Sequence, residues 1–316
     1  MSSQFRKRLL RWGGMAVMAG FLFLNFVACR QSRGLVRFAP SDQPPRRQGW
    51  QADLLGVEIP RPVNKRNPRD VGLRFETRTF PGAQGERVEA WIIPSDASPH
   101  GTVIAFHGHA GSKESLLSVA ARFHEWGWET WLVDFYGSGG SSGNETSIGW
   151  HEAEDVKAAF DQVARGSTGK PVVLFGASMG AAAILRSVAV HELKPEGLIL
   201  ECPFDRLRTT VASRFRREGF PTFPMLDLIL CWGGIQSGFN PYRHNPVEFA
   251  ATVRCPALLM QGDKDVTISL EESRSIARAL GARCAFRVFE GRGHEALQAG
   301  NPALWDREVL GFLRAF

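Results

Sequence analysis

The sequence VVLFGASMGA, residues 172–181, organises the rest of this chain. Its first four apolar residues predict a buried strand, and Gly176, Ser178 and Gly180 then predict a sharp turn into a helix. In such a turn the serine backbone is strained, and there is no room for side chains two positions before or after it. The pattern therefore indicates a serine whose hydroxyl is held above the edge of a sheet.

On either side of this turn, the chain alternates strands with helices. We expect an antiparallel strand pair at 71–80 and 87–94, and further strands at 102–106, 130–135, 197–201, 257–260 and 285–289. Helical spacing of apolar residues occurs at 116–126, 150–163, 270–280 and 302–316. Alternation at these lengths is typical of parallel βαβ units with helices on both faces of one sheet.

Polar residues follow the last two predicted strands. Asp263 and Asp265 come after the strand at 257–260, and His294 lies in the sequence GRGHE, residues 291–295, after the last strand. In open α/β sheets, ligands bind beyond the carboxyl ends of the strands. Together with Ser178, these residues give the chain order serine, acid, histidine.

This order resembles that of the α/β-hydrolase superfamily, and the resemblance covers residues 71–316. Asp134 with the Gly/Ser-rich turn at 137–143, the segment 149–155 and the Cys255-Pro256 pair are similar to the serine-aminopeptidase-like group of esterases, thioesterases and peptidases. The resemblance implies an α/β-hydrolase fold with a mostly parallel eight-stranded sheet. It leaves the substrate open, because the group is chemically mixed.

The residue types suggest distinct chemical roles. A serine hydroxyl is a poor nucleophile at neutral pH, and His294 is the expected base because a neutral imidazole has a suitable pKa. A carboxylate would fix the tautomer of that imidazole. The family pattern places this acid three residues after a glycine, which favours Asp265 over Asp263. Glu201 and Asp205 are weaker alternatives.

Negative charge that develops on a substrate carbonyl oxygen needs preset hydrogen-bond donors. In this fold they are the backbone N–H after the nucleophile and one from the loop after the third strand. Those groups belong to Met179 and, by its position after His107-Gly108, to His109. A contact between the His109 side chain and substrate is the alternative role for this histidine.

Other polar residues near the strand ends are expected to be structural. The turn at 137–143 lacks the lysine and hydroxyl residue of a nucleotide-binding loop, which favours a tight turn over a phosphate cradle. We expect Asp134, Glu152 and Asp155 to anchor loops and a helix start.

The first 29 residues have the composition of an export signal. Basic residues at 6–11 precede an apolar run at 13–28, which is short for a membrane-spanning helix. The run ends in Phe-Val-Ala-Cys29, which resembles a bacterial lipoprotein signal. We therefore expect a protein exported to a bacterial envelope and attached to the membrane by a lipid on Cys29, with an uncleaved N-terminal anchor as the alternative.

Charge is distributed unevenly along the chain. The first 70 residues hold 13 Lys and Arg against 4 Asp and Glu, which leaves 25 against 28 from residue 71 onward. Residues 30–70, rich in proline and arginine, are expected to form a tether. Since the predicted domain has neither a basic stripe nor a nucleic-acid-binding motif, we expect no nucleic-acid partner.

The five cysteines contain no Cys-x-x-Cys pair, and the histidines form no cluster at zinc spacing, so we expect neither a metal nor an organic cofactor. Cys255 and Cys284 both precede strands that should be neighbours. In an exported protein a disulfide between them is one expectation, and four separate thiols, including Cys202 and Cys231, is the other.

Residues 205–249 interrupt the fold where hydrolases insert a cap. They include an apolar patch formed by Phe220, Phe223, Met225, Leu226, Leu228, Ile229 and Trp232. We expect part of this patch to face the cleft above Ser178 and to favour uncharged substrates with a short to medium acyl or alkyl group. The arginines at 206–217 offer the alternative of an anionic substrate.

The resemblance and the complete set of residue types together predict a serine hydrolase that cleaves a small-molecule ester through an acyl-enzyme intermediate. Thioester or amide cleavage by the same fold is one alternative. A non-catalytic hydrolase-like binding protein is another, but such proteins usually lack a triad residue. The sequence sets no oligomeric state.

Overall fold

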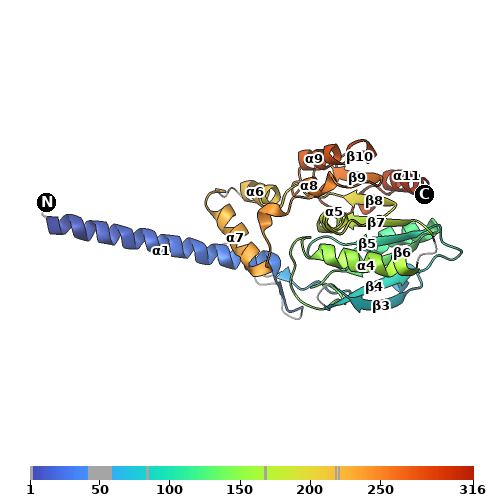
Figure 1. Ribbon diagram of the computed structural model, residues 1–316, viewed down its shortest axis with the longest axis horizontal. Helices are drawn as coiled ribbons and strands as arrows, with labels where there is room; N and C mark the ends of the chain where they lie inside the picture. The colour runs from blue at the N-terminus through green and yellow to red at the C-terminus, as the bar shows by residue number, and fades with distance from the viewer. Residues whose placement is uncertain (1–2, 42–58, 83–84, 167–168, 218, 220) are drawn as a thin grey trace.

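A twisted eight-stranded sheet forms the centre of the structure, a computed structural model that describes residues 3–41, 59–82, 85–166, 169–217, 219 and 221–316 (Figure 1). The strands are β3 (Glu76–Pro81), β4 (Arg87–Ile93), β5 (Thr102–Phe106), β6 (Glu129–Asp134), β7 (Val172–Ala177), β8 (Gly197–Glu201), β9 (Ala257–Gly262) and β10 (Cys284–Phe289). Their order across the sheet is β10-β9-β8-β7-β5-β6-β4-β3, and β4 alone runs against its neighbours. The chain has the α/β-hydrolase fold that its sequence predicts.

Helices cover both faces of this sheet because its central strands are apolar on both sides. Ile104 and Phe106 of β5 pack with the helices on one face, whereas Val103 and Ala105 pack with those on the other. The first face is covered by α4 (Glu152–Gly166), α5 (Met179–His191), α8 (Pro246–Ala250) and α9 (Leu270–Leu280). The second is covered by α3 (Leu117–Glu125), α10 (Leu297–Gly300) and α11 (Pro302–Leu313). Short 3₁₀ turns occupy Pro68–Val71, Lys113–Leu116, Pro241–Arg243 and Gly281–Arg283.

The cap expected between β8 and β9 is formed by α6 (Leu207–Arg217) and α7 (Met225–Ser237), followed by α8. Leu226 and Leu230 of α7 pack with Phe204, with Ala182 of α5 and with Ile268. This small apolar cluster seats the cap on α5, the helix that begins directly after Ser178.

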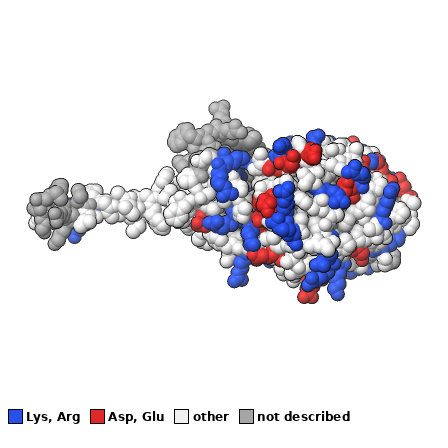
Figure 2. All heavy atoms as spheres, turned by 90° about the horizontal axis from the view of Figure 1, so that it is seen from above, with Lys and Arg blue, Asp and Glu red and all other residues white. Residues whose placement is uncertain are grey.

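The N-terminal segment is one long helix, α1 (Ser3–Val36), which projects from the domain as a rod (Figure 1). Within the described residues it is the one helix long and apolar enough to cross a membrane, over Leu10–Val36. From residue 12 to residue 26 the projecting part carries no charged side chain (Figure 2), and most of its apolar side chains in this stretch are exposed. Val27 and Ala28 are then only 3% and 0% exposed.

The last turns of α1 are buried because they pack along α7. Trp232 donates its indole N–H to the side-chain oxygen of Asn25 at 3.2 Å, and Gln236 donates to the carbonyl of Cys29 at 3.1 Å. Part of the apolar surface of α7 is thus covered by α1 rather than facing a cleft. Of the expected apolar patch, Phe223 is 81% exposed, and Phe220 lies outside the described residues.

Of the tether expected at residues 30–70, the structure describes residues 30–41 and 59–70, and both parts contain secondary structure. Residues 30–36 continue α1, and β1 (Phe38–Ala39) pairs in parallel with β2 (Ile59–Pro60). The Arg61 guanidinium donates to three carbonyls of the Gly/Ser-rich turn, those of Gly139, Ser141 and Gly143. Basic and proline-rich composition suggested a solvated linker, but here an arginine satisfies the carbonyls of a tight turn and docks the segment on the domain.

The cysteines do not pair: all five thiols are free. The register of the β9–β10 pair places Cys284 beside Ala257, whereas Cys255 lies two residues before β9 begins. Cys255 therefore precedes β9, whereas Cys284 is the first residue of the neighbouring β10, and the two are not direct partners across these strands.

Candidate active site

Ser178 lies at the turn between β7 and α5 with a positive φ, the backbone angles being φ 50° and ψ −110°. A non-glycine residue with positive φ is strained and persists where its surroundings impose it. The flanking glycines leave room for this turn: a Cβ on Gly176 would lie 2.6 Å from the Ala181 nitrogen, and one on Gly180 would lie 2.5 Å from the Phe106 carbonyl oxygen. Substitution at either glycine would thus push the turn away from the sheet.

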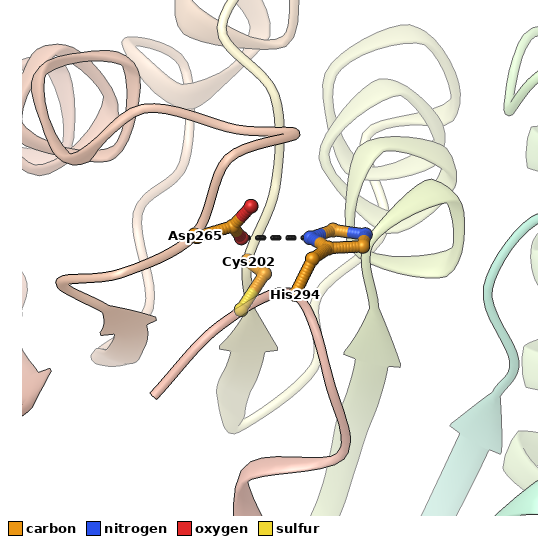
Figure 3. Close-up of side chains that lie close together, drawn as sticks. All are labelled: Cys202, Asp265 and His294. Carbon is orange, nitrogen blue, oxygen red and sulfur yellow. Dashed lines mark hydrogen bonds and ion pairs between the residues drawn. The ribbon is translucent and has the colours of Figure 1, made fainter. Parts of the chain in front are cut away.

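The loops after β7, β9 and β10 bring together the serine, acid and histidine expected from the sequence. His294 Nε2 lies 3.1 Å from Ser178 Oγ, and His294 Nδ1 lies 2.7 Å from Asp265 Oδ2. Figure 3 shows the edge of the imidazole turned toward the Asp265 carboxylate. Since a carboxylate only accepts, Nδ1 carries the proton, and Nε2 is left free to accept the serine proton.

The Asp265 carboxylate is held in its ionised form despite being buried. Burial alone would raise its pKa, but hydrogen bonding and charge interaction with His294, together with backbone N–H donors, lower the pKa below its usual value. Asp265 Oδ1 accepts from the N–H groups of Thr267 and Ile268, each at 2.8 Å. With His294 and the side-chain amide of Gln261, this makes four hydrogen-bond donors that fix the position of the carboxylate.

Gln261 is a site residue that sequence reasoning missed. It is fully buried, donates to Asp265 Oδ2 at 2.9 Å and accepts from Ser273 Oγ at 2.6 Å. Its amide thus links the acid to helix α9. Gln261 comes from within β9, and no local pattern in the strand signals that it reaches the following loop.

The rival acids lie elsewhere. Asp263 accepts from the N–H of Gly291 at 2.6 Å and so pins the loop that carries the histidine. Glu201 accepts from the indole of Trp305 at 2.6 Å, and burial raises its pKa to about 7. Burial also raises the pKa of Asp205, at the start of the cap. Of these carboxylates, Asp265 is the one bonded to His294.

The thiol of Cys202 lies beside Asp265 and His294, so that the three groups together resemble a small metal-ligand set (Figure 3). Both ring nitrogens of His294 are already used by Asp265 and Ser178. Burial, followed by the nearby Glu201 and Asp265 charges, raises the pKa of the Cys202 thiol well above its usual value. A thiol that keeps its proton is a poor metal ligand, so these groups suit a proton relay better than a metal centre.

The loop after β5 lies against the nucleophile, where the sequence places one oxyanion donor. A Cβ on Gly108 would lie 3.6 Å from the Ser178 Cβ. His107 fixes the loop from beneath: its Nδ1 lies 2.8 Å from the Gly108 carbonyl oxygen, and its Nε2 accepts from the N–H of Phe135 at 3.2 Å. Burial lowers the pKa of His107, which keeps the ring neutral for this double role. Met179 follows Ser178 directly in the chain, and the assignment of the His109 and Met179 N–H groups as oxyanion donors stays a prediction.

A buried ion network joins the loops at this end of the sheet. Lys113 is 0% exposed, pairs with Asp134 and with Glu89, the latter at 2.7 Å, and lies 4.5 Å from the Trp91 ring centre. Asp134 also accepts from the N–H of Gly140 at 2.7 Å. Asp134 thus anchors the Gly/Ser-rich turn, as expected.

The other two carboxylates expected to be structural also accept hydrogen bonds from neighbouring loops. Glu152 accepts from Ser147 and Gly149 before α4, and Asp155 accepts from the N–H of Tyr136. Both therefore anchor the loops around α4 in the way the sequence predicts.

One sizeable pocket, of 720 Å³, lies away from these residues. It is lined by Thr102 and Glu129, which begin β5 and β6, and by Arg78 and Trp131. The pocket thus lies at the amino ends of the strands. In parallel sheets, ligands bind beyond the carboxyl ends of the strands, where Ser178 lies. This pocket is therefore not a candidate for the reaction.

Comparison with known proteins agrees with the geometry. Residues 97–229 match the family model described as serine aminopeptidase, S33. The chain is 24% identical over 275 residues to the lysophosphatidylserine lipase ABHD12 of Macaca fascicularis, an alignment that covers 77% of this chain and 66% of the lipase. It is also 31% identical over 208 residues to the uncharacterised protein YfhR of Escherichia coli O157:H7, covering 64% and 66% of the two chains.

Solved structures share the fold. The Pyrococcus furiosus esterase Pf2001 superposes with a TM-score of 0.68 at 21% identity, covering 81% of this chain and 97% of that one. An esterase from Exiguobacterium antarcticum superposes with a TM-score of 0.57 at 18% identity, covering 75% and 98%. In its sheet order and in the turn that carries Ser178, the chain has the α/β-hydrolase fold. In sequence it resembles the serine aminopeptidase group, and it spans about 66% of the length of the lipase relative that it matches.

Proposed function

We propose that this protein is a membrane-attached serine esterase that cleaves carboxylic esters through Ser178, His294 and Asp265. The observation that carries the proposal is the chain of contacts from Ser178 Oγ to His294 Nε2 at 3.1 Å and from His294 Nδ1 to Asp265 at 2.7 Å. A strained serine bonded to an oriented imidazole is the arrangement that acyl transfer requires.

The proposed reaction has two halves. Ser178 Oγ gives its proton to His294 Nε2 and attacks the ester carbonyl, and the backbone N–H groups of His109 and Met179 stabilise the resulting oxyanion. The tetrahedral intermediate collapses to an acyl-serine while His294 returns the proton to the leaving alcohol. Water then repeats the sequence, with His294 as base, and releases the acid. Asp265 stabilises the imidazolium in both halves.

An ester of a hydrocarbon acid or alcohol is the favoured substrate class. Buried Leu226 and Leu230 bring an apolar cap onto α5, and a relative is named as a lipase of lysophosphatidylserine. An apolar wall favours a hydrocarbon group by about 0.8 kcal/mol per buried methylene until the pocket is filled. Rates on p-nitrophenyl esters of increasing acyl length should rise and then fall. A flat profile, or activity confined to anionic substrates at low salt, would argue for recognition by the cap arginines instead.

The N-terminus is proposed to attach the enzyme to a bacterial envelope membrane as an uncleaved helix. Buried Val27 and Ala28 and the Asn25–Trp232 bond support this form, because lipoprotein processing at Cys29 would remove all three residues from α7. Lipid attachment at Cys29 is the rival route, and the two differ in the mass of the mature N-terminus.

Covalent labelling tests the proposed nucleophile. A fluorophosphonate probe should label the wild-type chain, and Ser178→Ala should abolish the labelling and lower ester hydrolysis by about a thousandfold or more, because triad residues act as a unit. Ser187→Ala is a matched control, since Ser187 is a buried serine further along the same helix α5. Substantial labelling of the Ser178→Ala variant would refute the assignment.

A further inference from the structure

The C-terminal end of α1 does more than join the anchor to the domain. A helix leaves its last four carbonyls without intrahelical partners. Here the carbonyl of Leu35 lies 3.2 Å from His109 Nε2, and that of Val36 accepts the N–H of Thr146 at 2.8 Å. The partners of these two carbonyls thus come from two loops beside Ser178.

The first of these contacts reaches the proposed oxyanion donor directly. Since a carbonyl only accepts, His109 Nε2 is the donor. The ring of Phe38 also lies 6.1 Å from the His109 ring. Burial lowers the pKa of His109, which keeps the ring a neutral, single-tautomer donor. The imidazole is therefore turned toward α1, and its bond to Leu35 limits the movement of its own backbone.

The second contact leads to the other proposed donor in two steps. Phe38 donates its N–H to the carbonyl of Asn144 at 2.7 Å, beside the Val36–Thr146 bond. Thr146 Oγ1 in turn lies 2.6 Å from Glu152 Oε1 and 3.4 Å from the Met179 sulfur. The segment 35–38 therefore braces the loop against which the Met179 side chain packs.

We propose that residues 35–38, which we name the anchor end, are positioning residues of the oxyanion hole. They hold the His109 loop directly and the Met179 turn through Thr146, so that full activity requires α1 to be docked. This inference rests on the proposed function, because it assumes that the His109 and Met179 N–H groups stabilise the oxyanion. The anchor end contacts neither Ser178 nor His294 in the hydrogen bonds described, and acts through the two loops.

The test compares His109→Ala with His109→Gln in the full chain, in detergent micelles, on a p-nitrophenyl ester. His109→Ala removes the bond to Leu35 but keeps the backbone N–H, so kcat should fall by about tenfold, less than the 10²–10³ expected for loss of a donor. KM should stay within about twofold, because an oxyanion contact forms only in the transition state. His109→Gln, whose amide can donate to the same carbonyl, should recover most of kcat. Inhibition by a trifluoromethyl ketone, which forms an oxyanion adduct, should weaken in step with kcat.

A matched control and a second variant keep the test decisive. His124 also bonds through its ring to a backbone carbonyl, that of Pro94 at 2.9 Å, but on the far side of the sheet, so His124→Ala should leave kcat unchanged. If His109→Ala does not fold, Phe38→Leu decides the matter: it keeps the apolar burial, removes the ring contact with His109 and should lower kcat by about threefold.

The inference is overturned if kcat of His109→Ala stays within twofold of wild type, if KM alone rises, or if His109→Gln is as slow as His109→Ala. The first result would show that the loop is held without the anchor end, and the second would make His109 a substrate contact. Loss of activity in Ser178→Ala with full activity in His109→Ala defeats the inference alone. Activity retained in Ser178→Ala defeats the proposed function itself.

Discussion

At the scale of single residues, the sequence predicts site residues whose role constrains their neighbours in the chain, and it misses those whose contacts come from elsewhere in the fold. The turn at Ser178 was predictable because close packing acts on the positions two residues before and after the strained serine, where a Cβ would clash and glycine is required. Gln261 contacts Asp265 from within β9 and Cys202 lies beside it directly after β8, and no residue next to either one in the chain indicates these contacts. Asp265 was predictable as the acid from the family pattern. The hydrogen-bond partners of the alternative acids, Asp263 and Glu201, became visible only in the structure.

Substitution of the two neighbouring aspartates tests the assignment of the acid. Asp265→Asn should lower kcat by about 10³–10⁴, because an amide no longer fixes the tautomer of His294 or stabilises its positive charge. Asp263→Asn should cost only a few-fold, since Asp263 bonds the Gly291 N–H and not the histidine. Steady-state kinetics on one ester measures both, and the reverse ranking would transfer the role to Asp263.

Glu201 should make stability depend on pH. Its pKa is about 7 in the folded protein against 4.5 for the free side chain, so the folded state binds the proton more tightly. The contribution of Glu201 to stability therefore falls as the pH rises from 4.5 through 7, by up to about 3 kcal/mol. Glu201→Gln keeps an acceptor for Trp305 but cannot ionise.

Unfolding in urea at pH 5 and pH 8 measures this difference. The free energy of unfolding of Glu201→Gln, relative to that of the wild type, should be higher at pH 8 than at pH 5. The exposed Glu271→Gln serves as control, with no such gain expected. An equal difference at both pH values would mean that Glu201 does not titrate in this range.

At the scale of elements, the strands and helices of the sheet follow the sequence closely. The predicted strand at 102–106 coincides with β5, and the predicted helix at 270–280 coincides with α9. The cap and the N-terminus were less predictable. The apolar residues of α1 and α7 each predict a buried helix face, but a hydrophobic pattern does not show which other element will cover that face. The apolar surface assigned to a substrate cleft is therefore shared with the N-terminal helix.

The network around Lys113 should dominate the stability of the loops after β5 and β6. Lys113→Met keeps the apolar stem but leaves the buried Asp134 carboxylate without its cation and removes one of the two cations beside Glu89, which should destabilise the fold by about 3 kcal/mol. Lys157→Met is the matched control, because Lys157 forms a surface pair with Asp161 within α4 and such pairs contribute about 0.5 kcal/mol or less. Thermal unfolding should separate the two variants by several degrees, and equal midpoints would contradict a stabilising network.

At the scale of the whole molecule, the direction of α1 decides which end of the domain would lie nearest a membrane that this helix entered. The helix leaves the domain beside α7, so the cap and the carboxyl ends of the strands lie toward the projecting rod (Figure 1). If the exposed stretch up to Phe26 enters a bilayer, the exposed Phe223 and the cap arginines lie close to its surface. Substrate would then reach Ser178 from the membrane side.

The fate of residues 1–28 decides this orientation, and it can be measured on the mature protein. We expect an intact N-terminal helix, since its removal would expose the surface of α7 that now covers Val27 and Ala28 and would break the Asn25–Trp232 bond. Burial of one valine side chain alone is worth about 1.5–3 kcal/mol. Cys29→Ser should therefore leave the mass of the N-terminus and the membrane-bound fraction unchanged, as should Cys231→Ser, which alters an exposed cysteine on α7. A diacylated N-terminal Cys29 in the wild type, with release or accumulation of precursor in Cys29→Ser, would instead establish a lipoprotein. In that case the turns of α1 before Cys29 would contact the cap only in the precursor. The anchor end would then position the oxyanion loops although the mature chain began at a lipid-modified Cys29, only a few residues before it.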